Sequence, residues 1–220
     1  MKKIMKLTAV LLLAAALIIS GLFFVALLNG ALDNPGEIIP VCLALVLCAV
    51  TGLQLLLSAS PKEKRRGIVT FVLSILLIVY FFALFFTLFG NRDRLVIIRV
   101  GDARLSLRPF HTTKSFLKAY KKGAIETSAV VSNLMGNFIL FMPMALLLPL
   151  LFKKLRKLLR YAGLLLLMIV LVEVMQYLTM RGTMDVDDVM LNFTGTIVAF
   201  VVIWSRLGQA VLRKLGWIEA

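Results

Sequence analysis

The sequence predicts an all-α membrane protein, a polytopic bundle of about six transmembrane helices. Hydrophobic residues make up 61% of its 220 residues, and the mean hydropathy is +0.98. The apolar residues gather in long runs separated by short polar or basic segments, which is typical of membrane-spanning helices. The formal net charge of +14 does not indicate nucleic-acid binding. The basic residues lie between the apolar runs, where they orient the helices and meet anionic lipid.

The first 90 residues predict an N-terminal three-helix membrane region. The first apolar run has about 22 residues, which suits an uncleaved membrane span better than a signal peptide. The three runs are Leu7–Leu28, Ile38–Ser58 and Ile68–Phe89, and the basic loop Pro61–Gly67 joins the last two. The two cysteines, Cys42 and Cys48, lie six residues apart in the second run and face different sides of a helix. We therefore expect neither a disulfide nor a metal site there.

Residues 91–128 predict a basic loop outside the cytoplasm that contains a short β-hairpin. The segments Leu95–Val100 and Ala103–Leu107 flank Gly101-Asp102, which suits a two-residue turn. Pairing outward from this turn places Arg99 opposite Arg104, and directly opposed like charges are unfavourable unless an anion lies between them. The loop therefore predicts a site for a lipid headgroup or phosphate, with a solvated basic loop as the alternative. The residues of this site are Arg99, Arg104, Arg108, Pro109 and Phe110.

Residues 129–205 predict three further spans, and residues 206–220 predict an amphipathic tail on the cytoplasmic surface of the membrane. The spans cover Ala129–Phe152, Tyr161–Leu178 and Val189–Trp204. With the N-terminus inside, the inner segments hold 15 of the 25 Lys and Arg residues, and the outer segments hold 10. Nine of those ten lie in the loop over residues 91–128. The positive-inside rule favours a cell-membrane protein with both termini in the cytoplasm.

Polar residues in the last three spans predict one shared site. An ionisable group in hydrocarbon costs about 2.5–3.5 kcal/mol, so Glu173 in the fifth span requires a reason. At about 1.5 Å per residue from the span ends, the polar stripes of the three helices lie at a similar depth near the outer surface. Pro143 should free the carbonyl of Ile139 and bend the fourth span beside this site. We expect an outward-facing pocket lined by Asn133, Asn137, Glu173, Gln176, Arg181, Asp185, Asp188 and Asn192.

Each of these residues also has a structural explanation. The asparagines of the fourth span can hydrogen-bond to neighbouring helices. The aspartates at the start of the sixth span, Asp185, Asp187 and Asp188, can cap its N-terminus. Glu173 can form an ion pair with Arg181, whose fork of donors could also hold an aspartate. The residues alone are consistent with two interpretations, a ligand pocket and a set of purely structural contacts.

Three features of the sequence resemble the VanZ-like family of integral membrane proteins. One is the Pro-Phe element LRPFHTT (Leu107–Thr113), and another is GNFILFMP (Gly136–Pro143). The third is a spaced pattern matched by Glu173, Gln176, Arg181, Asp185, Asp188, Asn192 and Gly195. The resemblance covers roughly Ser106–Ala199, with departures from the family pattern at Ser106, Arg108 and Ala199. It implies a protein of the bacterial cell envelope, because the founding member is linked to low-level teicoplanin resistance, and it implies no reaction.

Three functions fit these patterns. The first is binding of an amphiphile, such as a lipid-linked cell-wall intermediate or a lipoglycopeptide, with arginines on its phosphate and the buried carboxylate on an amine or polar headgroup. The second is an intramembrane enzyme acting on lipid phosphates, in which Glu173, Asp185 and Asp188 hold a divalent cation. The third is a proton-coupled transporter with Glu173 as the titrating group. The sequence has no clear nucleophile–base pair to support the enzyme. It has no obvious inverted repeat to support the transporter.

The expected partners are the lipid bilayer and an anionic lipid or lipid-linked intermediate, with no nucleic acid. No catalytic motif, zinc-ligand spacing or nucleotide-binding motif occurs in the sequence, so we expect no resident cofactor beyond the divalent cation of the second hypothesis. The lone His111, beside the Pro-Phe element, is expected to be an ordinary loop residue. The sequence indicates neither the oligomeric state nor the identity of the ligand.

Overall fold

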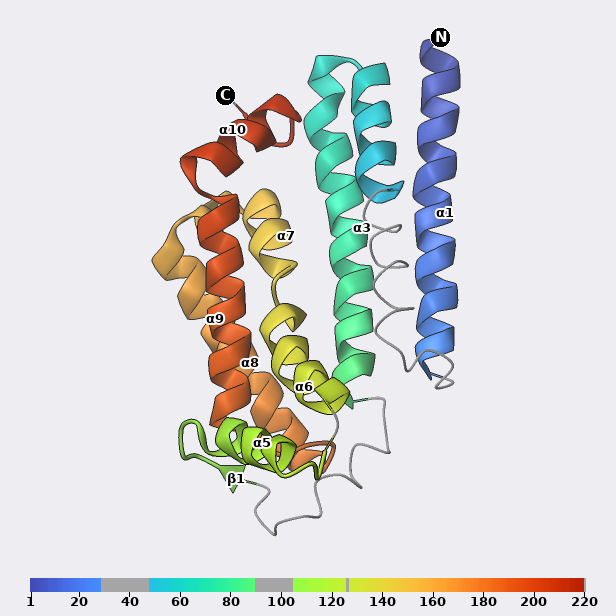
Figure 1. The fold of residues 1–220 in the computed structure, drawn as a ribbon. Coiled ribbons are helices and arrows are strands. Elements are labelled where there is room, and N and C mark those ends of the chain that lie inside the picture. Colours follow the sequence, from blue (N-terminus) through green and yellow to red (C-terminus); the bar gives the residue numbers. More distant parts are fainter. Residues whose placement is uncertain (29–47, 90–104, 126, 220) are drawn as a thin grey trace. The chain divides into compact units, whose positions relative to one another are not determined.

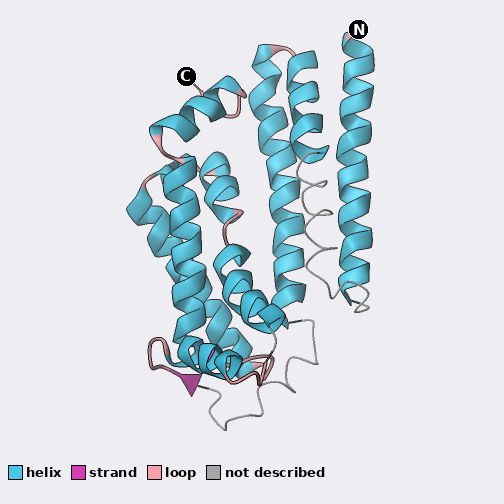
Figure 2. Ribbon diagram, in the orientation of Figure 1, coloured by secondary structure: helices cyan, strands magenta, loops and turns pink. Residues whose placement is uncertain are grey.

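The computed structural model describes residues 1–28, 48–89, 105–125 and 127–219, with the side chains of some helix residues left undescribed. Helices dominate these residues (Figure 2). The chain forms two compact units by its contacts. Unit 1 comprises Met1–Ala83 and Val211–Ala220, and unit 2 comprises Leu84–Ala210.

Four stretches of helix among the described residues are long and apolar enough to cross a membrane. They are α3 (Lys62–Phe89), the stretch Asn133–Leu151, α8 (Leu158–Leu178) and α9 (Val186–Ile203). They coincide with the third to sixth predicted spans, so the chain is a helical membrane protein. The first predicted span coincides with helix α1 (Lys2–Leu28), whose side chains are described only in part. The second lies partly outside the described residues, which resume at the helix Cys48–Ala59.

Unit 1 packs α1 against the helix Cys48–Ala59 through a glycine (Figure 1). A Cβ atom at Gly52 would lie 3.0 Å from Cγ of Leu13 and 3.2 Å from the carbonyl oxygen of Ala9. The C-terminal residues join this unit by two contacts. Gln54 donates a hydrogen bond of 3.3 Å to the carbonyl of Leu215, and Arg66 forms an exposed ion pair of 3.0 Å with Glu219.

In unit 2, helix α9 packs against α6 (Thr127–Leu140), α7 (Met144–Leu151) and α8. The buried residues of α8 recur every four positions, at Tyr161, Leu165, Ile169 and Glu173. This spacing places them on one face of the helix. The ring of Tyr161 stacks on Phe200 of α9 with centroids 4.4 Å apart. The opposite side of α8 exposes leucines, as expected of a helix that faces lipid.

The fourth predicted span breaks at Pro143, as expected of a proline inside a helix. Helix α6 ends at Leu140, three turn residues follow, and α7 begins at Met144. The carbonyl of Ile139 is not left free, because the N–H of Met142 donates to it at 3.0 Å. The carbonyl of Phe141 accepts a hydrogen bond of 2.7 Å from the hydroxyl of Thr196 on α9. The break is therefore fastened to α9.

The segment before α6 contains a helix that the sequence did not predict, α5 (His111–Lys121). Figure 1 shows α5 lying across the end of the longer helices of unit 2, and it contacts α6 and α9. The predicted β-hairpin lies mostly outside the described residues. Its described part includes the strand β1 (Leu105–Ser106), which pairs in parallel with β2 (Met184–Asp185). This pair joins the Pro-Phe element to the connection between α8 and α9.

Candidate functional site

A buried carboxylate lies near the end of α8. Glu173 continues the buried stripe of that helix and is 4% exposed. Its Oε2 accepts a hydrogen bond of 3.2 Å from the backbone N–H of Asp185. Asp185 caps α9, because its Oδ1 accepts from the N–H of Asp187 at 2.9 Å. These two hydrogen bonds fix the start of α9 to the carboxylate of α8.

The first turn of α9 brings Asp188 to the same place. Asn137 of α6 donates through Nδ2 to Oδ1 of Asp188, and Asn192 donates to the backbone carbonyl of Asp188 at 2.9 Å. The carboxylates of Asp185 and Asp188 lie close enough to Glu173 to repel its charge. We refer to these residues of α6, α8 and α9 as the polar cluster: Asn137, Glu173, Asp185, Asp188 and Asn192.

One acceptor of the polar cluster has no partner among the described residues. Asn192 is 3% exposed, and its Oδ1 is buried without a hydrogen bond. Leaving a buried amide oxygen unpaired costs about 1–3 kcal/mol, so proteins normally supply a donor. The polar cluster also contains the carboxylates of Glu173 and Asp188, which are acceptors as well. A water, hydroxyl or ammonium group has the chemistry that this position requires.

Asp187 holds the Pro-Phe element rather than the polar cluster. Asp187 is 3% exposed, and its carboxylate accepts hydrogen bonds from the backbone N–H groups of Phe110 and, at 2.9 Å, Thr113. These groups lie at the start of α5, where backbone donors have no partner within the helix. A carboxylate there also complements the helix dipole. Phe110 adopts a left-handed conformation with φ of 61°, which is uncommon for a residue with a side chain.

Two residues predicted to line the pocket with Glu173 contact the end of α3. Gln176 donates to the carbonyl of Leu88 at 3.2 Å, and Arg181 donates to the carbonyl of Phe89 at 3.0 Å. These carbonyls close the last turn of α3, where they lack helical partners. The structure describes the side chains of both Glu173 and Arg181, and the ion pair expected between them does not form. Arg181 therefore caps a neighbouring helix, which is a structural role.

The close approach of α6 to α9 depends on Gly195. A Cβ atom there would lie 1.8 Å from the carbonyl oxygen of Phe138. A side chain cannot occupy that space without moving the α6 backbone. Gly195 lies one turn after Asn192 on α9. The glycine thus allows Asn137 of α6 to reach Asp188.

The remaining predicted residues lie around the polar cluster. Asn133 is half-buried on α6, one turn before Asn137. Arg108, Pro109 and Phe110 are exposed in the Pro-Phe element. Arg99 and Arg104 lie outside the described residues, so their predicted headgroup site stays a prediction. His111 is exposed and begins α5.

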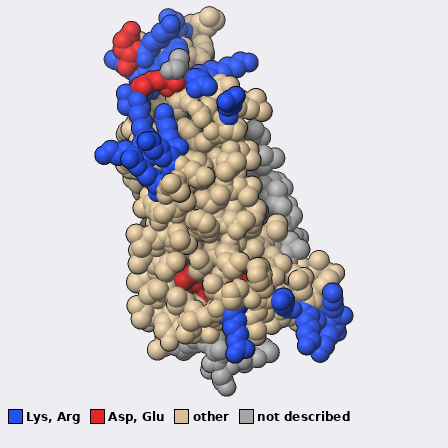
Figure 3. All heavy atoms as spheres, turned by 90° about the vertical axis from the view of Figure 1, so that its left-hand side faces the viewer, with Lys and Arg blue, Asp and Glu red and all other residues tan. Residues whose placement is uncertain are grey.

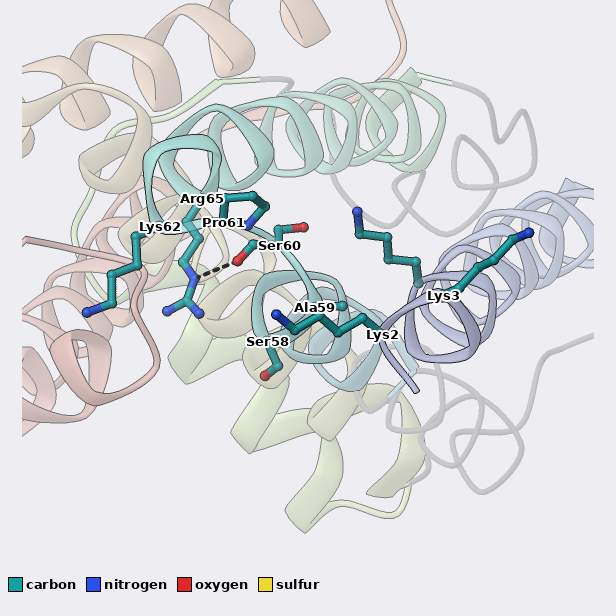
Figure 4. Close-up of a pocket in the computed structure, with 9 residues that line it drawn as sticks. Lys2, Lys3, Ser58, Ala59, Ser60, Pro61, Lys62 and Arg65 are labelled. Carbon is teal, nitrogen blue, oxygen red and sulfur yellow. Dashed lines mark hydrogen bonds between the residues drawn. The ribbon is translucent and has the colours of Figure 1, made fainter.

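A hollow of about 550 Å³ lies in unit 1 and contains none of the predicted site residues. Figure 4 shows lysine and arginine side chains around it, with Arg65 donating to the carbonyl of Ser60 at 3.4 Å. Its residues are Lys2, Lys3, Lys6, Ser58, Ala59, Ser60, Pro61, Lys62 and Arg65. Most of these basic side chains are exposed, which is the ordinary state of the charged end of membrane helices.

No group of three His, Cys, Asp or Glu side chains among the described residues has a geometry that could hold a metal ion. The described carboxylates of the polar cluster are instead bound by backbone N–H and amide groups. The proposed divalent-cation site at Glu173, Asp185 and Asp188 therefore gains no support from their arrangement.

The role of Asp187 was not predicted from the sequence. It is one of three aspartates at the start of α9, and any of them could cap the helix. A signal for it did exist in the Pro-Phe element, because a helix N-terminus without an acidic residue of its own requires an acceptor from elsewhere. Likewise, the lysines and apolar residues of α5 alternate at helical spacing, which predicts an amphipathic helix.

A comparison with protein-family models gives a match that includes the helices of the polar cluster. The VanZ/LLP1 family model matches residues 69–209, which is more than half of the chain. Comparisons with curated proteins and with solved structures found no match. The matched segment contains the Pro-Phe element, α5 to α9 and every residue of the polar cluster. The chain therefore belongs to the VanZ/LLP1 family of membrane proteins.

Proposed function

We propose that the polar cluster binds the polar part of an amphiphile of the cell envelope. The amphiphile is a lipid-linked cell-wall intermediate or a lipoglycopeptide, and its hydrocarbon part lies along the apolar surface of the helices. In this proposal the cluster faces outward, with both termini of the chain in the cytoplasm. Membership of a family linked to glycopeptide resistance supports this class of ligand.

The placement of polarity in α8 supports a binding role. Its exposed face carries leucines, such as Leu167 and Leu171, whereas its buried face ends in the carboxylate of Glu173. An apolar residue at 173 would pack in the same position without the cost of burying a charge. The hydrogen bond from the N–H of Asp185 offsets part of the free-energy cost of burying Glu173. In our proposal, ligand binding is the reason that the remaining cost is tolerated.

The observation that carries the proposal is the unpartnered Oδ1 of Asn192 in a cluster that also contains the carboxylates of Glu173 and Asp188. A ligand that donates hydrogen bonds, through an ammonium group or sugar hydroxyls, complements three acceptors in one place. A phosphate would be repelled there. In our proposal it lies at the basic Pro-Phe element, where Arg108 is exposed, and at Arg99 and Arg104.

The proposal is tested by binding measurements on the full chain in nanodiscs. Teicoplanin and a matched glycopeptide without the acyl chain are the two probes, and native mass spectrometry of the released protein reports retained lipids. We expect teicoplanin or a retained lipid-linked intermediate to bind the wild-type protein, and Asn192→Ala to weaken that binding about tenfold, the effect of one lost hydrogen bond to a charged group.

Asn133→Ala is the matched control, because Asn133 was predicted in the pocket but lies outside the polar cluster, one turn before Asn137 on α6, and makes no hydrogen bond among the described residues. It should leave binding unchanged. Equal binding by the wild type and both variants would reject the polar cluster as the site. Binding of neither probe, together with no retained amphiphile, would reject the proposed function.

A further inference from the structure

Helix α5 has three distinct faces. One face is half-buried and contains Thr112, Phe116 and Ala119. Helix α5 contacts α6 and α9. A second face exposes large apolar side chains. Phe110, just before the helix, is 52% exposed, and Leu117 and Tyr120 are 42% and 43% exposed. Within the helix, Leu117 and Tyr120 lie in one sector, because residues three positions apart are neighbours on a helix surface.

The third face of α5 is basic. Lys114, Lys118 and Lys121 follow one another at helical spacing and are exposed, and Lys122 continues the series. Helix α5 itself contains no Asp or Glu. The lower group of basic side chains in Figure 3 lies at the level of α5, and a band of uncharged side chains adjoins it. A helix with adjoining apolar and basic faces is typical of a segment that lies in the membrane interface.

The position of α5 agrees with its surface. It lies across the end of the longer helices of unit 2 (Figure 1), and α6 begins at Thr127, shortly after α5 ends. Exposed apolar residues of α6, Met135 and Ile139, begin the lipid-facing surface of that span. The buried carboxylate of Asp187 fixes the start of α5 against α9. The helix is therefore fixed next to the start of this apolar surface.

We propose that α5 lies in the headgroup layer and binds anionic phospholipid, with Leu117 and Tyr120 in the acyl boundary and the lysines on lipid phosphates. Charge complementarity favours this occupant. A leaflet of anionic lipid offers negative charge beside hydrocarbon, in the same order as the basic and apolar faces of α5. The inference rests on α5 alone and does not depend on a ligand in the polar cluster.

The experiment places spin labels on the full chain in nanodiscs of phosphatidylglycerol or phosphatidylcholine. Single cysteines replace Leu117 or Lys118 in a chain whose native cysteines are changed to alanine. We expect the label at 117 to be accessible to oxygen but not to a water-soluble nickel reagent, at a depth of about 5–10 Å. The label at 118 should be accessible to the nickel reagent.

The charge requirement is tested at the same label. The depth at 117 should be greater in phosphatidylglycerol, with an oxygen-to-nickel accessibility ratio roughly threefold higher than in phosphatidylcholine. The triple variant Lys114→Gln, Lys118→Gln, Lys121→Gln should abolish this difference. The matched control Lys2→Gln, Lys3→Gln, Lys6→Gln removes the same charge elsewhere and should preserve it.

Three results would overturn the proposal. Equal, water-like accessibility at 117 and 118 would mean a solvated helix. Shielding of 117 from both reagents would mean that a protein, such as a second copy of the chain, covers this face. Loss of the lipid dependence in the control variant as well would mean that net charge alone is responsible.

Discussion

The two ends of α8 differ in the sign of the charged side chains that lie there and in how those side chains are held. The connection before α8 is basic, and Lys154 and Lys157 are exposed in it. The other end of α8, together with the start of α9, carries acidic residues that are buried and bound. Glu173 accepts from the N–H of Asp185, and Asp187 accepts from two N–H groups of the α5 start.

This difference separates two uses of charge in a membrane protein. Exposed basic residues orient the helices through their number, so individual residues are replaceable. Buried acidic residues act through particular hydrogen bonds, so their positions matter. We therefore expect substitutions before α8 to be tolerated and substitutions after it to be costly. The following predictions test this contrast, beginning with the largest effect.

The two ends of α8 should lie on opposite sides of the membrane. This difference is all-or-none. Single cysteines at Lys118 of α5 and Lys154 before α8 are both exposed positions of unit 2. In a chain without Cys42 and Cys48, an impermeant maleimide added to intact cells should modify position 118 and leave 154 unmodified. Both should react after lysis. The reverse pattern would place the polar cluster on the cytoplasmic side.

Gly195→Ala should destabilise unit 2 more than any other substitution considered. The new Cβ would lie 1.8 Å from the carbonyl oxygen of Phe138, so α6 and α9 must separate. Overpacking against backbone costs about 3 kcal/mol. Gly136→Ala is the control on α6, since nothing lies within 4 Å of its Cβ position. Thermal unfolding in detergent should show a large loss for the first variant and none for the second.

Asp187→Ala should release α5. Two backbone N–H groups lose their acceptor, at a cost of about 2–3 kcal/mol. Hydrogen exchange should accelerate at Phe110 and Thr113 and remain slow along α8. Asp187→Asn retains an acceptor and should have a smaller effect. Glu219→Ala, which breaks an exposed ion pair with Arg66, is the control and should change stability by less than about 0.5 kcal/mol. Unchanged exchange in Asp187→Ala would show that Asp187 does not hold the start of α5.

The smallest contrast lies within the basic connection. Arg156 is half-buried, donates to the carbonyl of Pro149 at 3.1 Å and lies 5.1 Å from the ring centroid of Trp204. Arg156→Gln should cost about 1 kcal/mol through the lost cation–π contact and hydrogen bond. Lys157→Gln should cost nothing measurable. Equal effects of the two substitutions in thermal unfolding would mean that the contacts of Arg156 contribute nothing.

Much of the fold follows from local rules of sequence. The apolar runs predicted the four membrane-spanning stretches, and Pro143 predicted the break between α6 and α7. These features depend on residues close together in the chain. The pairing of β1 with β2 joins Leu105 to Met184, and the sequence contains no local signal for a two-residue contact over that distance. The choice of partner for Arg181 also depended on where α3 ends.

The candidate site was predicted as a set of residues but not as a set of contacts. The high cost of burying a carboxylate identified Glu173, and helical spacing placed Asn192 on the face of Asp188. The three aspartates at the start of α9 have similar sequence signals, although the structure gives them different partners. Asp185 caps α9, Asp187 holds α5 and Asp188 accepts from Asn137. Only packing distinguishes these roles.

The most direct test of the account is the Glu173→Gln protein, with thermal stability and bound amphiphile measured on the same sample. Glutamine keeps the shape and the acceptor for the N–H of Asp185 but removes the charge. If the carboxylate serves a ligand, the melting temperature should stay within about 3 °C of the wild type, equivalent to less than about 1 kcal/mol, while the bound amphiphile falls at least about tenfold. Unchanged ligand retention in the folded variant, or a loss of binding only in proportion to unfolded protein, would contradict it.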